Sequence, residues 1–264
     1  MYISGKTKQF KELFMAEYNF PTETIDLPSG GKFYPEGSPL RSGKIDVKYM
    51  TAKEEDILTS TNLIQKGTVI DKLMESLIVT PGVKPDDLLI GDLNAVMVAA
   101  RILAYGKDYP IEAACGTCGS KFTHTVDLTS LEMVAPTDDV INNEYEVTLP
   151  TGVNVTFKLL TRADEKEIAA EINAIKKVGT GIDPESTTRL KYIVTSFNGN
   201  RERSAVRQFA EAMIIRDVRA LRDAYKKVSP DVNLDLNIVC STCDTSIKTR
   251  MPFGANFFWP DLGV

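Results

Sequence analysis

The 264-residue sequence contains one histidine, one tryptophan and four cysteines, and these scarcities exclude several classes of active site. It has no GxxxxGK[ST] phosphate loop, no GxGxxG dinucleotide motif and no GxSxG nucleophile motif. A Ser-His-Asp or Cys-His catalytic site would have to use His124, and nothing in the surrounding sequence marks it for that role. The sequence therefore favours a protein that is not an enzyme.

Long apolar runs are also missing. No run approaches the 18 residues of a transmembrane helix, and the first residues, MYISGKTKQFKELF, lack the apolar centre of an export signal. A hydrophobic content of 43% with 25% charged residues is typical of a globular protein with enough apolar material for a core. The net charge of −5 argues against a dedicated nucleic-acid binder.

The four cysteines form two Cys-x-x-Cys motifs, CGTCGSKFTHTVDL and CSTCDTSIKTRMPF, each between two strand-like runs. We predict that both motifs share one structural zinc ion, because such a site needs four ligands and no cysteine is left over. The predicted ligands are Cys115, Cys118, Cys240 and Cys243, and His124 is expected to be an ordinary strand residue. The long separation between the motifs is unlike that of a compact zinc ribbon.

Other uses of the cysteines stay open at this point. A secreted chain would form two disulfides, and buried free thiols would need no metal. A thioredoxin-like redox pair usually opens a helix, whereas these motifs lie between predicted strands. A Cys-x-x-Cys motif could also complete its metal site with a second chain.

The order of predicted elements indicates an α+β fold with two related repeats. Each half has a strand, a threonine-capped helix, further helices and a Cys-x-x-Cys hairpin, and KLMESLIVT is echoed by RLKYIVTSF. We predict an N-terminal helix and extended arm over 1–44, repeats over 45–135 and 136–253, and an aromatic tail over 254–264. The zinc site would join the two repeats.

Aromatic residues gather in segments that do not read as core. They lie in a predicted amphipathic helix over 6–18, in the Pro- and Gly-rich arm that follows it, and in the tail MPFGANFFWPDLGV. Such residues either pack onto their own domain or anchor a partner protein. The predicted partner-binding residues are Phe10, Phe14, Phe33, Tyr34, Phe257, Phe258 and Trp259.

The segment IDLPSGGKFYPEGSPLRSGKIDVKYMTAKEEDIL, followed by GTVIDKLMESLIV, resembles the baseplate hub and hub-assembly proteins of T-even-like contractile-tailed bacteriophages. The resemblance is clearest over residues 25–128. It implies a structural tail protein or assembly chaperone, built in the host cytoplasm and located in the baseplate of the virion. The partners it implies are other hub proteins, the tail tube or the tape-measure protein, with no membrane and no nucleic acid.

Two other functions compete with this one. A zinc-ribbon module for nucleic acid would use a basic patch, with Arg201, Arg203, Arg207 and Arg250 as candidates. A metal-dependent enzyme would require a metal with an open coordination position.

Overall fold

A computed structural model describes residues 21–136, 143–177, 181 and 183–258. The predicted helix over 6–18, with Phe10 and Phe14, and also Trp259, lie outside these residues. No helix in the described ranges is long and apolar enough to cross a membrane. We refer below to residues 21–136 as the first half and to residues 143–258 as the second half.

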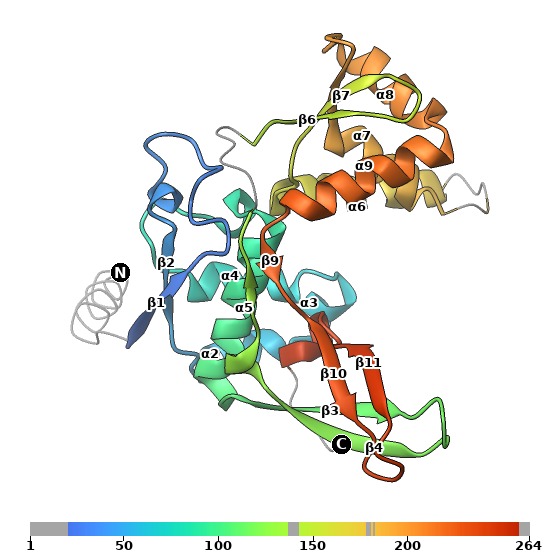
Figure 1. The fold of residues 1–264 in the computed structure, drawn as a ribbon. Coiled ribbons are helices and arrows are strands. Elements are labelled where there is room, and N and C mark those ends of the chain that lie inside the picture. Colours follow the sequence, from blue (N-terminus) through green and yellow to red (C-terminus); the bar gives the residue numbers. More distant parts are fainter. Residues whose placement is uncertain (1–20, 137–142, 178–180, 182, 259–264) are drawn as a thin grey trace, which may run out of the picture.

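The fold is α+β, as predicted, with several small antiparallel sheets. The helices of the two halves form two separate groups in Figure 1, and two long hairpins extend together away from them. The strands are β1 (Thr22–Asp26), β2 (Lys44–Lys48), β3 (Asp108–Ala114), β4 (Lys121–Asp127), β5 (Met133–Val134), β6 (Tyr145–Thr148), β7 (Asn154–Phe157), β8 (Val194–Phe197), β9 (Asp231–Val232), β10 (Asp235–Val239) and β11 (Ser246–Arg250). The helices are α2 (Ala52–Leu58), α3 (Thr61–Gln65), α4 (Val69–Leu77), α5 (Ile90–Tyr105), α6 (Arg162–Lys177), α7 (Glu185–Ile193), α8 (Arg203–Ala212) and α9 (Ile215–Val228).

The first helix of each half begins with the predicted threonine cap. Before α2, the Glu54 carboxylate accepts hydrogen bonds from the N–H and hydroxyl of Thr51, at 2.9 and 2.6 Å. Before α6, Asp164 accepts the same two bonds from Thr161, at 2.9 and 3.0 Å. A lysine from the preceding strand or its end also pairs with each acid, Lys48 with Glu54 and Lys158 with Asp164. The first helix of each half therefore begins with the same hydrogen-bonded arrangement of a threonine, an acid and a lysine.

In both halves, hydrogen bonds also join the turn after the first strand to the last long helix. The turns are LPSG at 27–30 and LPTG at 149–152, and in each the glycine N–H donates to the leucine carbonyl at 2.8 Å. Asp92, the third residue of α5, accepts from the Ser29 N–H at 2.9 Å. Asp217, the third residue of α9, accepts from the Thr151 N–H and hydroxyl at 3.3 and 2.6 Å. Both aspartates are buried, so each has a fixed partner inside the protein.

The arm differs from the expectation of an extended segment apart from the core. Strand β1 pairs with β2 across the predicted boundary at residue 44, and Phe33 and Tyr34 are buried. The Tyr34 hydroxyl donates to Asp92 at 2.5 Å and accepts the Leu89 N–H at 3.0 Å. Burial raises the pKa of both Tyr34 and Asp92. This long-range contact holds the arm against α5.

The sequence of TTRLKYIVTSF indicates one of the further helices of the second half, but the segment changes from helix to strand. Helix α7 ends at Ile193, and Val194–Phe197 form β8 beside β7. The valine and threonine of this segment favour a strand, and β7, the central strand of this sheet, supplies the backbone partners. In the first half, Ile78 occupies the same place after α4 and pairs with Val47 of β2.

The two halves meet through the first turns of α5 and α6. The Arg162 N–H donates to the Leu88 carbonyl at 2.9 Å, and the Ile90 N–H donates to the Leu160 carbonyl at 3.2 Å. A Cβ atom built on Gly91 would lie 1.8 Å from the Pro230 carbonyl oxygen. Glycine at position 91 therefore permits this close approach of backbone to backbone.

Replacing Glu54 by Gln tests the buried cap. Burial alone would raise the pKa of Glu54, but hydrogen bonds from Lys48, Ser76 and Thr51 lower it to about 2. A lowered pKa means that the carboxylate stabilises the fold above about pH 4.5, and that this contribution disappears as the pH falls towards 2. We expect Glu54→Gln to lower the free energy of unfolding by about 2 kcal/mol near neutral pH and to flatten its acid dependence. Urea titrations across this pH range measure both effects.

The exposed neighbour Glu55 provides the matched control. Glu55→Gln should leave the unfolding free energy within about 0.5 kcal/mol of the original chain. Equal losses in the two variants would contradict this account of Glu54.

Replacing Gly91 by Ala tests the contact between the halves. The added methyl group overlaps backbone atoms of Pro230, which have no rotamer through which to move away. We expect a loss of about 3 kcal/mol or more in unfolding free energy, measured by chemical denaturation. Gly254→Ala is the control, because a Cβ there meets no atom within 4 Å. Similar stability of the two variants would show that the contact is not tight.

Candidate metal centre

The two Cys-x-x-Cys turns connect β3 to β4 and β10 to β11, and they have the same hydrogen bonds. The Cys115 N–H donates to Ser120 O and the Cys240 N–H to Thr245 O, both at 2.9 Å. Gly119 and Asp244 occupy the matching left-handed position, with φ of 72° and 56°. An aspartate tolerates this conformation better than most residues, so the second turn keeps its shape without the glycine of the first.

These turns bring the four sulfur atoms together. The Sγ atoms of Cys115 and Cys243 are 3.7 Å apart, as are those of Cys118 and Cys240, and all four lie within 4.8 Å of one another. A tetrahedral ion with metal–sulfur bonds of about 2.3 Å would place its sulfurs about 3.8 Å apart. A disulfide would need about 2.05 Å, so these pairs are not bonded to each other. The four cysteines are thus spaced to bind one metal ion.

Polar groups beside the sulfurs of Cys118 and Cys240 favour the thiolate form of these two residues. The Ser120 hydroxyl lies 3.0 Å from the Cys118 sulfur and 3.4 Å from the Cys240 sulfur. Its hydrogen bond, with that of the Thr242 N–H, lowers the pKa of Cys240 to about 6. Ser120 also lowers the pKa of Cys118. At Cys243, hydrogen bonds with Thr245 lower the pKa, but contacts with Cys118 and Cys240 and burial outweigh them and raise it. Since the thiolate is the metal-binding form, the shifts at Cys118 and Cys240 favour binding at neutral pH and the shift at Cys243 opposes it.

The two turns bury their cysteines in the same pattern. Cys115 and Cys240, the first cysteine of each motif, are buried, and Cys118 and Cys243 are exposed. The first sulfur of each turn also receives a backbone N–H two residues later, from Thr117 and from Thr242, both at 3.4 Å. Such N–H···S bonds hold the sulfurs in place before any ion arrives.

His124 does not belong to this group. It lies on β4 opposite Ile111 and is half-buried. The cluster in the described residues consists of the four cysteines alone. The sequence interpretation missed Ser120 and Thr245, which place a hydroxyl beside a sulfur in each turn. Their common position, two residues after the second cysteine, was the available signal.

The aromatic residues that were predicted to bind a partner are buried wherever the structure describes them. Phe33, Tyr34, Phe257 and Phe258 have at most 6% of their surface exposed. The Phe257 ring packs 5.1 Å from that of Tyr109 on β3. Their side chains therefore fill the core of the chain and are not available as docking anchors, which corrects the prediction for these four residues.

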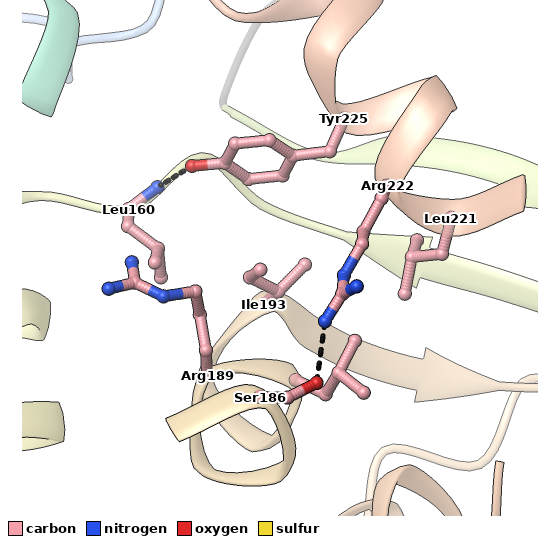
Figure 2. Close-up of a pocket in the computed structure, with 8 residues that line it drawn as sticks. Leu160, Ser186, Arg189, Ile193, Leu221, Arg222 and Tyr225 are labelled. Carbon is pink, nitrogen blue, oxygen red and sulfur yellow. Dashed lines mark hydrogen bonds between the residues drawn. The ribbon is translucent and has the colours of Figure 1, made fainter. Parts of the chain in front are cut away.

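The second half contains a small apolar cavity of about 140 Å³ between α7 and α9. Figure 2 shows Leu160, Ile193, Leu221 and Tyr225 around it, with the Tyr225 hydroxyl accepting the Leu160 N–H at 3.1 Å. Arg222 lies at one side and bonds Ser186. The polar residues of its lining are Ser186, Arg189, Arg222 and Tyr225, with no histidine, cysteine or carboxylate among the lining residues.

The arginines proposed for nucleic-acid binding are mostly paired with acids. Arg201 pairs with Glu144 at 2.8 Å, Arg207 with Glu171 at 2.5 Å, and Arg250 lies 3.7 Å from Asp235. Each carboxylate offsets the positive charge that a phosphate would need. The structure thus supplies no observation in favour of the nucleic-acid alternative.

Comparison with known proteins gives one decisive result. The model of the family described as T4 bacteriophage base plate protein matches residues 18–259. The chain belongs to this baseplate family. No curated protein and no solved structure matches significantly. The match spans both halves and all four cysteines, and it confirms the resemblance found in the sequence.

Removing a ligand and removing the metal should have the same effect on stability. We expect a strong chelator to lower the unfolding free energy of the original chain, on the order of 5 kcal/mol, because binding a metal stabilises only the folded state. Cys240→Ser should show that loss without chelator and little further loss with it. Thermal unfolding monitored by circular dichroism measures the stability of the original chain and of Cys240→Ser, each with and without chelator.

His124→Ala is the control for this experiment. It should keep the full response to chelator, because His124 is not among the clustered residues. A chelator effect that persists undiminished in Cys240→Ser would place the metal elsewhere.

Proposed function

We propose that this chain is a non-enzymatic component of the baseplate hub of a contractile phage tail, or a chaperone that assembles the hub. The observation that carries the proposal is the family match over nearly the whole chain. The partners are other hub proteins, the tail tube or the tape-measure protein. Its location is the baseplate of the virion, with assembly in the host cytoplasm.

The proposed cofactor is one structural zinc ion per chain, bound by Cys115, Cys118, Cys240 and Cys243. Sulfur spacings of 3.7 Å suit zinc–sulfur bonds of about 2.3 Å in a tetrahedron. Four thiolate ligands leave no open position for a substrate, which is typical of a structural site. When bound, zinc would hold the β3–β4 and β10–β11 turns together, while the chain's own N–H and hydroxyl groups orient the sulfurs.

The proposal includes two related units joined by this zinc. The threonine caps, the buried aspartates on the LPSG and LPTG turns, and the two cysteine turns occur in the same order in both halves. We place the second unit at 136–253, as the sequence suggested. The first unit ends at 135 but begins near residue 21, because β1 pairs with β2.

The experiment is a quantitative mass-spectrometric comparison of purified tails and infected-cell lysate, using the phage that encodes this chain. A hub component should be found in purified tails at a fixed ratio to the tail-tube protein. An assembly chaperone should be found in the lysate, bound to hub proteins, and should be absent from tails. Normal baseplates formed after deletion of the gene would refute both roles.

Complementation of that deletion compares matched variants. Cys240→Ser should lower the yield of complete tails about tenfold or more, because the metal no longer holds the two cysteine hairpins together. His124→Ala should restore the original yield. Chemical crosslinking of assembling tails then identifies which of the hub, tube or tape-measure proteins lies beside the chain.

A further inference from the structure

The joint between the two halves has a simple construction. A segment before the last long helix of the first half, Leu88–Ile90, lies antiparallel to a segment before the first helix of the second half, Leu160–Arg162. We call these the inserting segment and the receiving segment. Two backbone hydrogen bonds join them, and each uses the N–H of the first residue of a helix, which has no partner inside its own helix.

Each half contains the equivalent of both segments. The buried Asp92 and Asp217 fix the inserting segments at the same place, so Met213–Ile215 corresponds to Leu88–Ile90. The Thr51 and Thr161 caps fix the receiving segments, so Met50–Ala52 corresponds to Leu160–Arg162. The internal joint uses the inserting segment of the first half and the receiving segment of the second half. The inserting segment Met213–Ile215 and the receiving segment Met50–Ala52 are therefore not used in it.

The side chains of the unused inserting segment, Met213–Ile215, are more exposed than those of the used one. Leu89 is 3% exposed and its counterpart Ile214 is 51% exposed. Ile90 is half-buried and its counterpart Ile215 is 68% exposed, while Leu88 is buried and its counterpart Met213 is half-buried. Two adjacent isoleucines with that much surface in water are a common sign of a binding site. Among the described residues, neither the Ile215 N–H nor the Met213 carbonyl is hydrogen-bonded.

The unused receiving segment is open as well. Met50 is half-buried, whereas its counterpart Leu160 is buried, and Ala52 is exposed, whereas its counterpart Arg162 is half-buried. Within the described ranges, the Ala52 N–H and the Met50 carbonyl also have no hydrogen-bond partner. These are the groups that correspond to the Arg162 N–H and the Leu160 carbonyl of the internal joint.

We propose that a second copy of this chain docks at these segments, with Met213–Ile215 of one copy against Met50–Ala52 of the next. The contact would repeat the joint that the chain already makes between its own halves. One open segment of each kind per chain gives a head-to-tail contact, which closes into a ring or extends as a filament. This inference rests on the two-unit organisation proposed above.

Charges beside the segments limit the strength of this contact. In the internal joint, Lys166 of α6 pairs with Asp86 and lies 3.5 Å from Asp71. The corresponding positions for a second copy are Asp56 and Glu211, which are both acidic. Glu211 already pairs with Lys191, so the repulsion is reduced but not removed. The contact should therefore tighten with salt, because salt screens exposed charges of like sign.

Sedimentation velocity over a concentration series tests the proposal with the full chain. The original chain should show a mass that rises with concentration, and more steeply at higher salt. Asp56→Lys should tighten the association about fivefold, because it places a lysine opposite Glu211, as Lys166 lies opposite Asp86. Ile215→Glu should abolish association in both backgrounds, since it puts a charge at the centre of the contact.

Met133→Glu is the matched control, because Met133 is 51% exposed on β5, outside both segments. It should associate like the original chain. A chain that stays monomeric at every concentration, with and without Asp56→Lys, would overturn the inference. Equal weakening by Ile215→Glu and Met133→Glu would overturn it too, by showing non-specific association.

The metal content of each variant, measured on the same samples, separates this inference from the proposed function. If the original chain binds its metal but stays monomeric, with and without Asp56→Lys, only the head-to-tail contact is overturned. Metal missing from the original chain would instead refute the zinc-joined units.

Discussion

The four sulfur atoms at the tips of two hairpins are the constraint on which the arrangement of these hairpins depends. Hairpins β3–β4 and β10–β11 are each two-stranded sheets, and a two-stranded hairpin by itself is only marginally stable in water. Val239, next to the buried Cys240, is 56% exposed, so the turn has little apolar cover of its own. The two hairpins extend together away from the helices (Figure 1). A metal bound by both turns would add stability to them.

The rest of the chain is organised by repeated polar anchors inside apolar surroundings. A buried acid caps or receives a backbone N–H at each critical junction, as Glu54 does before α2 and Asp217 does in α9. Buried carboxylates are costly unless each is fully bonded, so they fix one arrangement of turn and helix. The same anchors fix the positions of the inserting and receiving segments. These segments join the two halves, and in the proposed contact they would also join copies of the chain.

Much of the fold was predictable because its signals are local. The threonine caps at Thr51 and Thr161, the glycine after α5 and the alternating strands around the cysteines all depend on residues a few positions apart. The clustering of the four cysteines was predictable for another reason, since two Cys-x-x-Cys motifs and no other cysteine leave few ways to arrange four thiols.

The remaining features depend on contacts between distant residues. Nothing near Tyr34 shows that Asp92 will accept its hydroxyl, so the arm reads as a surface loop although it is core. The Phe257 ring is buried by Tyr109, far away in the sequence. The tetrapeptides LPSG and LPTG were visible, but their role became clear only when both were found bonded to a buried aspartate. The joint between halves uses backbone groups, which leave almost no trace in the sequence.

The central claim is that one metal ion connects the two halves, and native mass spectrometry of the full chain tests it most directly. The account predicts one zinc ion per single chain, lost when either cysteine pair, Cys115 with Cys118 or Cys240 with Cys243, is replaced by serine. Zinc retained after removal of one pair, or zinc present only in dimers, would contradict a shared centre within one chain.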